Sequence, residues 1–247
     1  MKNQSAKLAK LSALLLLALF PLALARAESV IVTGAAGMSA VYENTRNPTE
    51  IRIEVRKNGR AVQTIRYEYP ESCTYADMFG TEVRFADADF DGHDDILLSL
   101  GTYGVHRYEH CFLWSEAERK FVSDSTFEKI ANPVIDVAEK CVYGFEKKNP
   151  AHYVYTVYRF QNGTFSPDLA LHETCALELA ELYGIEIPDG EDRGGYALKR
   201  LGLPPDIHEE TLYVEEFYAD GRRTVRQPTL RPSERFRKVL SKMEESK

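Results

Sequence analysis

Residues 87–95 carry acidic side chains whose spacing could bind a divalent metal ion. The segment reads D-x-D-x-D-G-x-x-D, with glycine at its sixth position. A hard cation such as Ca²⁺ takes about six to eight oxygen ligands, and a loop that turns sharply at glycine directs alternate side chains inward. The spacing predicts a calcium site in which His93 contributes its backbone carbonyl and Asp95 binds through both carboxylate oxygens. The predicted ligands are Asp87, Asp89, Asp91, His93 and Asp95.

This loop differs from an EF-hand. An EF-hand needs glutamate at its twelfth position, where this chain has Leu98, and a helix on each side. Here short apolar segments typical of strands flank the loop, so we expect a calcium-binding connection between two strands. Without a metal ion the carboxylates would repel one another, and the alternative interpretation is a solvated acidic turn that binds no metal.

Alternating apolar and polar residues predict strands along most of the chain. Asn58-Gly59 and Asn162-Gly163 are turn dipeptides that tolerate positive φ, and each lies between two alternating segments, as in a β-hairpin. The pattern predicts a mainly antiparallel all-β fold, either propeller-like or a sandwich of hairpins, with a few short helices that are mostly C-terminal. The expected strands are residues 51–55, 65–69, 82–85, 96–100, 107–114, 121–122, 134–136, 140–145, 151–160 and 164–171.

The last part of the chain has a different pattern. Residues 173–183 and 233–245 have helical periodicity, the second with Ser233 as N-cap, and residues 184–195 are rich in Gly, Pro and acid, as in a loop. Residues 212–218 and 222–229 suit a late hairpin. We therefore expect a β-domain over residues 28–183 that contains the calcium loop, and a C-terminal extension over residues 184–247 that consists of a loop, a hairpin and a basic helix.

The first 27 residues have the features of a secretory signal peptide. Three lysines precede an apolar segment at residues 11–24, and Ala25-Arg26-Ala27 forms a small-x-small cleavage site. We find no other segment long or apolar enough for a transmembrane helix, and no cysteine that follows the cleavage site for a lipid anchor. The sequence predicts an exported protein, periplasmic or secreted, without a transmembrane anchor.

Charge is unevenly distributed along the predicted mature chain. Cleavage at residue 27 leaves 27 basic and 38 acidic residues, a net charge of −11, whereas residues 221–247 hold nine basic and three acidic residues. Residues 28–220 therefore carry −17. An acidic body disfavours nucleic acid and favours cationic partners or metal ions. The alternative interpretation is colloidal solubility, with the basic tail folded against the acidic body.

Four cysteines in an exported chain allow two disulfides. Three pairings are possible, and position favours Cys73 with Cys111 and Cys141 with Cys175. No CxxC pair is present, which argues against a zinc site.

The loop at residues 87–95, followed by Ile96-Leu97-Leu98, resembles the FG-GAP or VCBS-type calcium loop of integrin-like β-propellers. Together with the hairpins and aromatic strands at residues 48–172, it resembles a small exported bacterial family with one such loop. Members of that family include periplasmic immunity proteins that inhibit peptidoglycan hydrolases delivered by type IV secretion systems. The chain departs from that family in lacking a lipobox cysteine and in having the C-terminal extension.

Two motifs suggest enzymes, and their context argues against both. His106, Glu109 and His110 spell the inverted zinc-protease motif, but on a strand the two histidines would lie about 13 Å apart. Residues 32–37 (VTGAAG) are similar to a dinucleotide-binding turn, but the third glycine position is Ala40 and hairpins follow. An exported glycosidase or carbohydrate-binding module remains an alternative.

These observations favour a non-enzymatic, calcium-stabilised exported protein that binds another protein. The resemblance implies that this partner is a peptidoglycan hydrolase, and the acidic body suits a cationic, lysozyme-like enzyme. The alternative function is a calcium-binding envelope adhesion or glycan-binding module without inhibitory activity.

Overall fold

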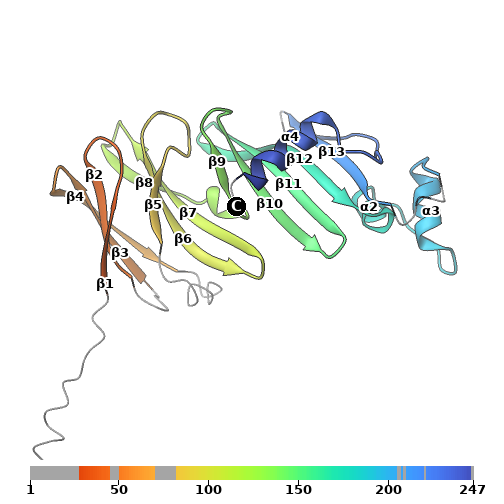
Figure 1. Ribbon diagram of the computed structural model, residues 1–247, viewed down its shortest axis with the longest axis horizontal. Coiled ribbons are helices and arrows are strands. Elements are labelled where there is room, and N and C mark those ends of the chain that lie inside the picture. The colour runs from red at the N-terminus through yellow and green to blue at the C-terminus, as the bar shows by residue number, and fades with distance from the viewer. Residues whose placement is uncertain are drawn as a thin grey trace, which may run out of the picture.

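The computed structural model describes residues 28–44, 50–69, 82–204, 207, 210–219 and 221–245. Three antiparallel sheets follow one another in chain order along the long axis of the molecule, and the short helices of the C-terminal part of the chain lie over the third sheet and beyond its far end (Figure 1). This confirms the predicted all-β class with few helices. The predicted signal peptide lies outside the described residues.

Each of the first two sheets is a four-stranded meander in which neighbours in sequence pair in space. The predicted hairpin about Asn58-Gly59 is confirmed, with φ of 51° and 77° at the two turn residues. The first sheet comprises β1 (Glu28–Thr33), β2 (Met38–Asn44), β3 (Glu50–Lys57) and β4 (Arg60–Glu68). The second comprises β5 (Val83–Ala86), β6 (Asp95–Tyr103), β7 (His106–Ser115) and β8 (Lys120–Asp124).

The third sheet has six strands in the order β14-β13-β12-β11-β10-β9. The predicted strand over residues 151–160 is β11, which lies inside the sheet between β10 and β12. The predicted late hairpin is also confirmed, as β13 and β14. The strands are β9 (Val134–Asp136), β10 (Cys141–Asn149), β11 (His152–Gln161), β12 (Thr164–Thr174), β13 (Leu212–Ala219) and β14 (Arg222–Val225).

The second sheet is covered on both faces, and β6 shows why. Ile96 and Leu98 face the core that the second sheet shares with the first, whereas Leu97, between them, faces the core shared with the third. All three side chains are at most 1% exposed. A strand that packs between two layers must be apolar on both faces, which accounts for the continuous apolar run after the acidic loop. The loop is thus attached to the most buried strand of the middle sheet.

Four helical segments complete the described fold: the 3₁₀ turn η1 (Phe127–Lys129), α2 (Ala176–Leu182), α3 (Arg193–Arg200) and α4 (Glu234–Glu244). The Ser233 side chain accepts a hydrogen bond from the Phe236 amide, as expected of the N-cap. Helix α2 begins later than predicted because β12 continues to Thr174. Helix α3 was not predicted, and its first residues overlap the expected loop at residues 184–195. Asp192 is its N-cap, and the Asp192 side chain accepts a hydrogen bond from the Gly195 amide. No helix in the described ranges is long and apolar enough to cross a membrane.

The C-terminal elements are joined to the third sheet. Strand β13 pairs with β12, so the predicted boundary near residue 183 falls between two strands of one sheet. Helix α4 covers part of the outer face of that sheet, where Phe236, Val239 and Met243 pack on residues that include Leu171 (Figure 1).

The predicted disulfide between Cys141 and Cys175 is wrong, since both thiols are free. Val142 pairs with Tyr158, whereas Cys175 lies beyond Glu173, which pairs with Tyr153. The two cysteines therefore lie about eight residues apart along the strand direction, or about 26 Å at 3.3 Å per residue. A disulfide requires Cα atoms within about 7 Å. Cys111 is also a free, buried thiol, so its predicted pairing with Cys73, a residue outside the described ranges, is wrong as well.

Candidate metal centre

The acidic loop connects β5 to β6 and is closed by the pairing of Ala86 with Asp95. Two residues within it have left-handed backbone conformations, Phe90 with φ of 67° and Gly92 with φ of 91°. A Cβ atom at Gly92 would meet no atom within 4 Å, so glycine is favoured there by the backbone conformation and not by lack of space. The glycine at the sixth position thus makes the sharp turn that the motif requires.

Three of the predicted ligands converge at the base of the loop. One carboxylate oxygen from each of Asp87, Asp89 and Asp95 lies within 4.8 Å of the others. Oxygen atoms that bind the same calcium ion at about 2.3 to 2.6 Å cannot be more than about 5 Å apart. The spacing of the three carboxylates therefore fits one shared calcium ion.

Asp95 is the buried anchor of this group. Its side chain is 0% exposed, and its two oxygens accept hydrogen bonds from the Trp114 and Ala88 amides, each at 2.8 Å. Burial, together with the charge of Asp89, raises the pKa of Asp95 to about 7, although the two amides act in the opposite direction. A fully buried carboxylate without a cationic partner is unfavourable, and a bound cation would relieve this.

Asp89 and Asp87 are the other two residues of this group. Burial and the charge of Asp91 raise the pKa of Asp89 to about 6. Oδ2 of Asp87 accepts a hydrogen bond from the Gly92 amide at 3.1 Å, but its Oδ1 is buried and has no hydrogen-bond partner among the described residues. Buried polar atoms are nearly always satisfied in native proteins. An oxygen that lacks a partner and belongs to a converging carboxylate group is suited to a metal ion.

The side chains of Asp91 and His93 lie outside this group. Both residues are exposed. One Asp91 oxygen accepts a hydrogen bond from the His93 amide at 2.8 Å and lies 3.2 Å from the His93 Nδ1 atom. The structure thus brings together the carboxylates of three of the four predicted aspartate ligands, with Asp91 as the exception. His93 is predicted to bind through its backbone carbonyl, and that part stays a prediction.

The donor set of the converging group fits a hard cation. It consists entirely of carboxylate oxygens, the ligands that Ca²⁺ and Mg²⁺ prefer, and contains no sulfur or imidazole nitrogen. Ca²⁺ tolerates irregular geometry better than Mg²⁺, which favours Ca²⁺ at a site formed by three carboxylates at the base of one loop. Asp87, Asp89 and Asp95 would hold the ion, and the ion would supply the positive charge that the buried carboxylates lack.

Asp94 and Trp114 contribute to the site although the motif did not identify them. Oδ2 of Asp94 accepts a hydrogen bond from the Ala35 amide at 2.5 Å, which joins the loop to the β1–β2 turn of the first sheet. Trp114 bonds to Asp95 through its backbone and to Glu116 through its indole N–H. The sequence offered no signal for these contacts, because the Ala35–Asp94 bond spans 59 positions.

Residues 92–94, the outer half of the loop, also line a pocket of about 310 Å³. Trp114, Met38 and Phe121 provide its apolar lining, and His93 and Glu116 lie at its polar side. The Glu116 side chain is 70% exposed and lies 3.9 Å from the His93 Nε2 atom. A change in the loop would therefore alter the shape and charge of this pocket.

The two motifs that suggest enzymes have separate structural roles. His106 and His110 lie on β7, as expected, and have different partners: His106 Nε2 accepts from the Lys147 amide, whereas His110 bonds to Glu128 and Ser123. Residues 32–37 include the turn between β1 and β2. Both motifs thus have structural roles: the two histidines join β7 to neighbouring segments, and residues 32–37 connect β1 to β2.

No protein-family model matches the chain, and no curated protein matches it significantly. A solved structure described as that of a Xanthomonas type IV secretion system related protein is similar, with 13% sequence identity and a TM-score of 0.49. The alignment covers 81% of this chain and 96% of that one.

Proposed function

We propose that this protein is a calcium-stabilised, exported protein-binding module that inhibits a peptidoglycan hydrolase and has no catalytic activity of its own. The observation that carries the proposal is the convergence of Asp87, Asp89 and Asp95 in a loop whose sequence resembles the calcium loop of exported hydrolase inhibitors. Calcium would act as a permanent structural ion that fixes the loop and the surface around it.

The contact surface that we propose lies around the loop. The β7–β8 turn carries Glu116 and Glu118, whose side chains are 70% and 55% exposed, and Glu116 lines the same pocket as the outer half of the loop. Trp114 adds an aromatic ring to this surface. Acidic groups beside a large aromatic ring suit the cleft of a cationic hydrolase, because electrostatic attraction speeds encounter and aromatic contacts provide affinity.

The inhibitory mechanism would be occlusion of the substrate cleft. Calcium holds the loop, Asp94 ties the loop to the first sheet, and the acidic turn then presents a fixed surface to the enzyme. A preordered surface loses less conformational entropy on binding than a mobile one. Binding should also weaken with salt, since exposed charges are screened over about 10 Å at 0.1 M ionic strength.

The first test is a peptidoglycan turbidity assay with a panel of muramidases and related wall hydrolases. We expect stoichiometric protection by the mature protein in calcium, and loss of protection in the Asp89→Ala/Asp91→Ala variant. The Asp189→Asn variant is a matched control, because Asp189 is an exposed carboxylate outside the loop. The Glu116→Lys/Glu118→Lys variant should bind calcium normally and still lose protection, which separates the contact surface from the metal site.

The runner-up is a glycan-binding or adhesion module of the cell envelope. The observation that favours it is the pocket beside the loop, since an aromatic ring such as that of Trp114 can stack on a sugar. Retention on insoluble peptidoglycan, lost on Trp114→Ala substitution and unaffected by any hydrolase, would support this function. A stable one-to-one complex with a hydrolase would contradict it.

A further inference from the structure

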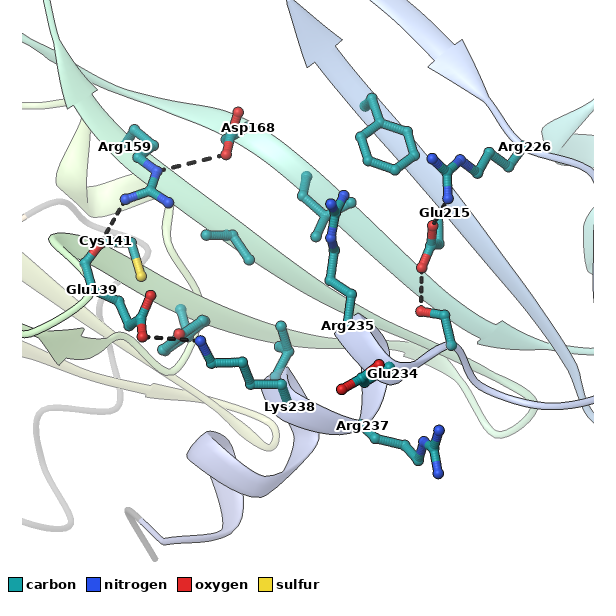
Figure 2. Close-up of a pocket in the computed structure, with 16 residues that line it drawn as sticks. Glu139, Cys141, Arg159, Asp168, Glu215, Arg226, Glu234, Arg235, Arg237 and Lys238 are labelled. Atoms are coloured by element: carbon teal, nitrogen blue, oxygen red, sulfur yellow. Dashed lines mark hydrogen bonds and ion pairs between the residues drawn. The ribbon is translucent and has the colours of Figure 1, made fainter.

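Outside the loop, polar side chains are hydrogen-bonded or ion-paired in two different ways. Beside α4, the basic C-terminal segment folds against the acidic body, as the alternative interpretation of its charge predicted, and opposite charges balance one another (Figure 2). The pairs, both at 2.9 Å, are Lys238 with Glu139 and Arg226 with Glu215. The cluster around His110, at the core between the first two sheets, differs because a hydroxyl, an imidazole and a carboxylate follow one another in it.

His110, on β7, joins two side chains from different elements. Its Nε2 atom lies 2.8 Å from Oγ of Ser123 on β8, and its Nδ1 atom is hydrogen-bonded to a carboxylate oxygen of Glu128 on η1. The Tyr67 hydroxyl, from the first sheet, donates to the same Glu128 oxygen at 2.8 Å. A serine, a histidine and a carboxylate that are bonded in this order form the constellation that activates a serine as a nucleophile.

The carboxylate determines which nitrogen of His110 carries the proton. The hydrogen bond from His110 holds the pKa of Glu128 below its ordinary value, so Glu128 is ionised and can only accept. Nδ1 of the neutral imidazole therefore carries the proton, and Nε2 has the lone pair that accepts from the Ser123 hydroxyl. The rings of Tyr67 and Phe112, each with its centroid 4.5 Å from that of His110, hold the imidazole in place.

Ser123 can be reached from solution although its base cannot. The serine is exposed, whereas His110 is 2% exposed. A reagent in solvent can therefore approach the serine oxygen, and the imidazole that would take its proton lies directly behind it. Burial also keeps bulk water away from His110, so that Ser123 is the hydroxyl that this base contacts.

The backbone of Ser123 supplies a hydrogen-bond donor beside the hydroxyl. Strand β8 is the last strand of the second sheet, and both backbone groups of Phe121 point out of the sheet, where they bond to the Gln63 side chain at 2.8 and 2.9 Å. Residues two apart on a strand point their backbone groups to the same side, so the Ser123 N–H also points out of this edge. An amide beside the nucleophile can stabilise the oxyanion that forms when a serine attacks a carbonyl.

We propose that Ser123 is a nucleophile that is acylated by donors with a weakly basic leaving group, such as aryl esters or thioesters. The O–H proton passes to Nε2 of His110, the serine oxygen forms a bond to the carbonyl carbon, and the bond between that carbon and the leaving group breaks. The leaving group departs with the proton, which returns His110 to its neutral form.

The geometry favours retention of the acyl group over turnover. Its release would need a water molecule activated by His110, but Nε2 lies behind Ser123 and would be covered by the acyl group. Acylation is therefore a covalent modification of the protein. It goes beyond the proposed inhibition of a hydrolase, and it is compatible with a protein that has no catalytic activity of its own.

The test is labelling of the mature protein in calcium with a fluorophosphonate, followed by mass spectrometry of the intact protein and its peptides. This reagent forms a P–O bond to an activated serine and releases fluoride. We expect a single adduct on Ser123 that is absent from Ser123→Ala. Ser125→Ala is the matched control and should label like the wild type, because Ser125 is exposed but has no imidazole partner among the described residues. p-Nitrophenyl acetate should acetylate Ser123 and release one equivalent of p-nitrophenolate.

Two further variants test the other members of the cluster. His110→Gln should slow labelling by about 100-fold, since general-base catalysis contributes about 10²- to 10⁴-fold. Wild-type labelling should become faster from about pH 5 to pH 8, because only the neutral imidazole accepts the proton. Glu128 is a positioning residue, and Glu128→Gln should shift this rise to lower pH, because the imidazolium loses the carboxylate that stabilises it. Circular dichroism melts of each variant would show whether the fold is retained.

Several outcomes would overturn the proposal. These are absence of an adduct, equal labelling of the wild type and Ser123→Ala, and an unchanged rate in a folded His110→Gln variant. The cluster would then only join β7 to β8 and η1. Release of p-nitrophenolate that depends on Ser123 and continues beyond one equivalent would contradict retention of the acyl group.

Discussion

Two buried carboxylates, Asp95 in the second sheet and Glu216 in the third, lie in opposite electrostatic surroundings. Asp95 is 0% exposed and Glu216 is 2% exposed. Burial alone would raise the pKa of both. The pKa of Asp95 is raised to about 7, whereas contacts from His172, Arg223 and Tyr218 outweigh burial at Glu216 and hold its pKa well below the ordinary value.

The difference lies in where the compensating charge comes from. Nε of Arg223 donates to Glu216 at 3.0 Å, the Tyr218 hydroxyl donates at 2.6 Å, and His172 Nε2 lies 3.4 Å away. Asp95 has two backbone amides and acidic neighbours instead. The third sheet thus contains its own cation, whereas the metal site that we propose in the loop would take one from solution. Only the loop should make stability depend on a metal ion.

The largest expected effect is that of calcium withdrawal on thermal stability. A ligand present at one hundred times its Kd stabilises the folded state by about 2.7 kcal/mol. For a domain of this size, chelation should therefore lower the melting midpoint by about 5 to 10 °C. Scanning calorimetry with calcium and then with chelator measures this shift.

Two variants sharpen the comparison. Asp89→Asn should lose most of the calcium-dependent shift, whereas Glu216→Gln should keep all of it, because only the first alters the converging carboxylates. An unchanged midpoint of the wild-type protein after chelation would refute the metal site.

Substitution of Glu216 should destabilise the protein whether or not calcium is present. Glu216→Gln removes the negative charge that Arg223 and His172 face, and breaking a buried ion pair costs about 3 to 5 kcal/mol. Because the Arg223 side chain is 44% exposed, solvent screening reduces the expected loss to about 2 kcal/mol. Urea unfolding in calcium and in chelator measures it, and Asp189→Asn is the surface control. Loss of stability in only one of the two buffers would contradict the comparison.

Acid should remove part of the stability that ionised Glu216 contributes, with a smaller effect than the substitution has. A lowered pKa means that the folded state holds Glu216 ionised, so its contribution is fully present above the unfolded value of about 4.5 and is lost as pH falls. The groups that face it are Tyr218, Arg223 and His172, with His152 hydrogen-bonded to His172. We expect the urea midpoint to fall more steeply between about pH 5 and pH 3 in the wild type than in Glu216→Gln. Parallel curves would count against the lowered pKa.

Local sequence signals predicted most strands because they depend on nearby residues. Turn dipeptides such as Asn58-Gly59 and the alternation on either side of them were sufficient to place hairpins, and Ser233 was sufficient to place the start of α4. Strands β1 and β2 were not predicted, because their residues directly follow the predicted signal peptide and include a glycine-rich turn. Helix α3 was missed because its sequence, RGGYALKR, has two glycines and low helical propensity.

Contacts that depend on sheet stacking could not be predicted. The carboxylate spacing identified Asp87, Asp89 and Asp95, but it did not separate them from Asp91, whose side chain turns toward His93. The pairing of Cys141 with Cys175 was mistaken for a similar reason. The distance between the two cysteines depends on the register of β10, β11 and β12, which the sequence does not reveal.

The smallest expected effect is spectroscopic, and it reports on the loop alone. Trp114 is the single tryptophan of the chain, and its amide donates to Asp95 at 2.8 Å while its indole N–H donates to Glu116 at 3.0 Å. Calcium binding at Asp95 should therefore change the tryptophan emission at constant fold. Asp95→Asn should abolish this change, and Glu216→Gln should leave it intact, since Glu216 lies in the third sheet. A calcium response that disappears in Glu216→Gln would mean that the two carboxylates are coupled. It would contradict the distinction between Asp95, whose charge a metal ion from solution would balance, and Glu216, whose charge Arg223 balances.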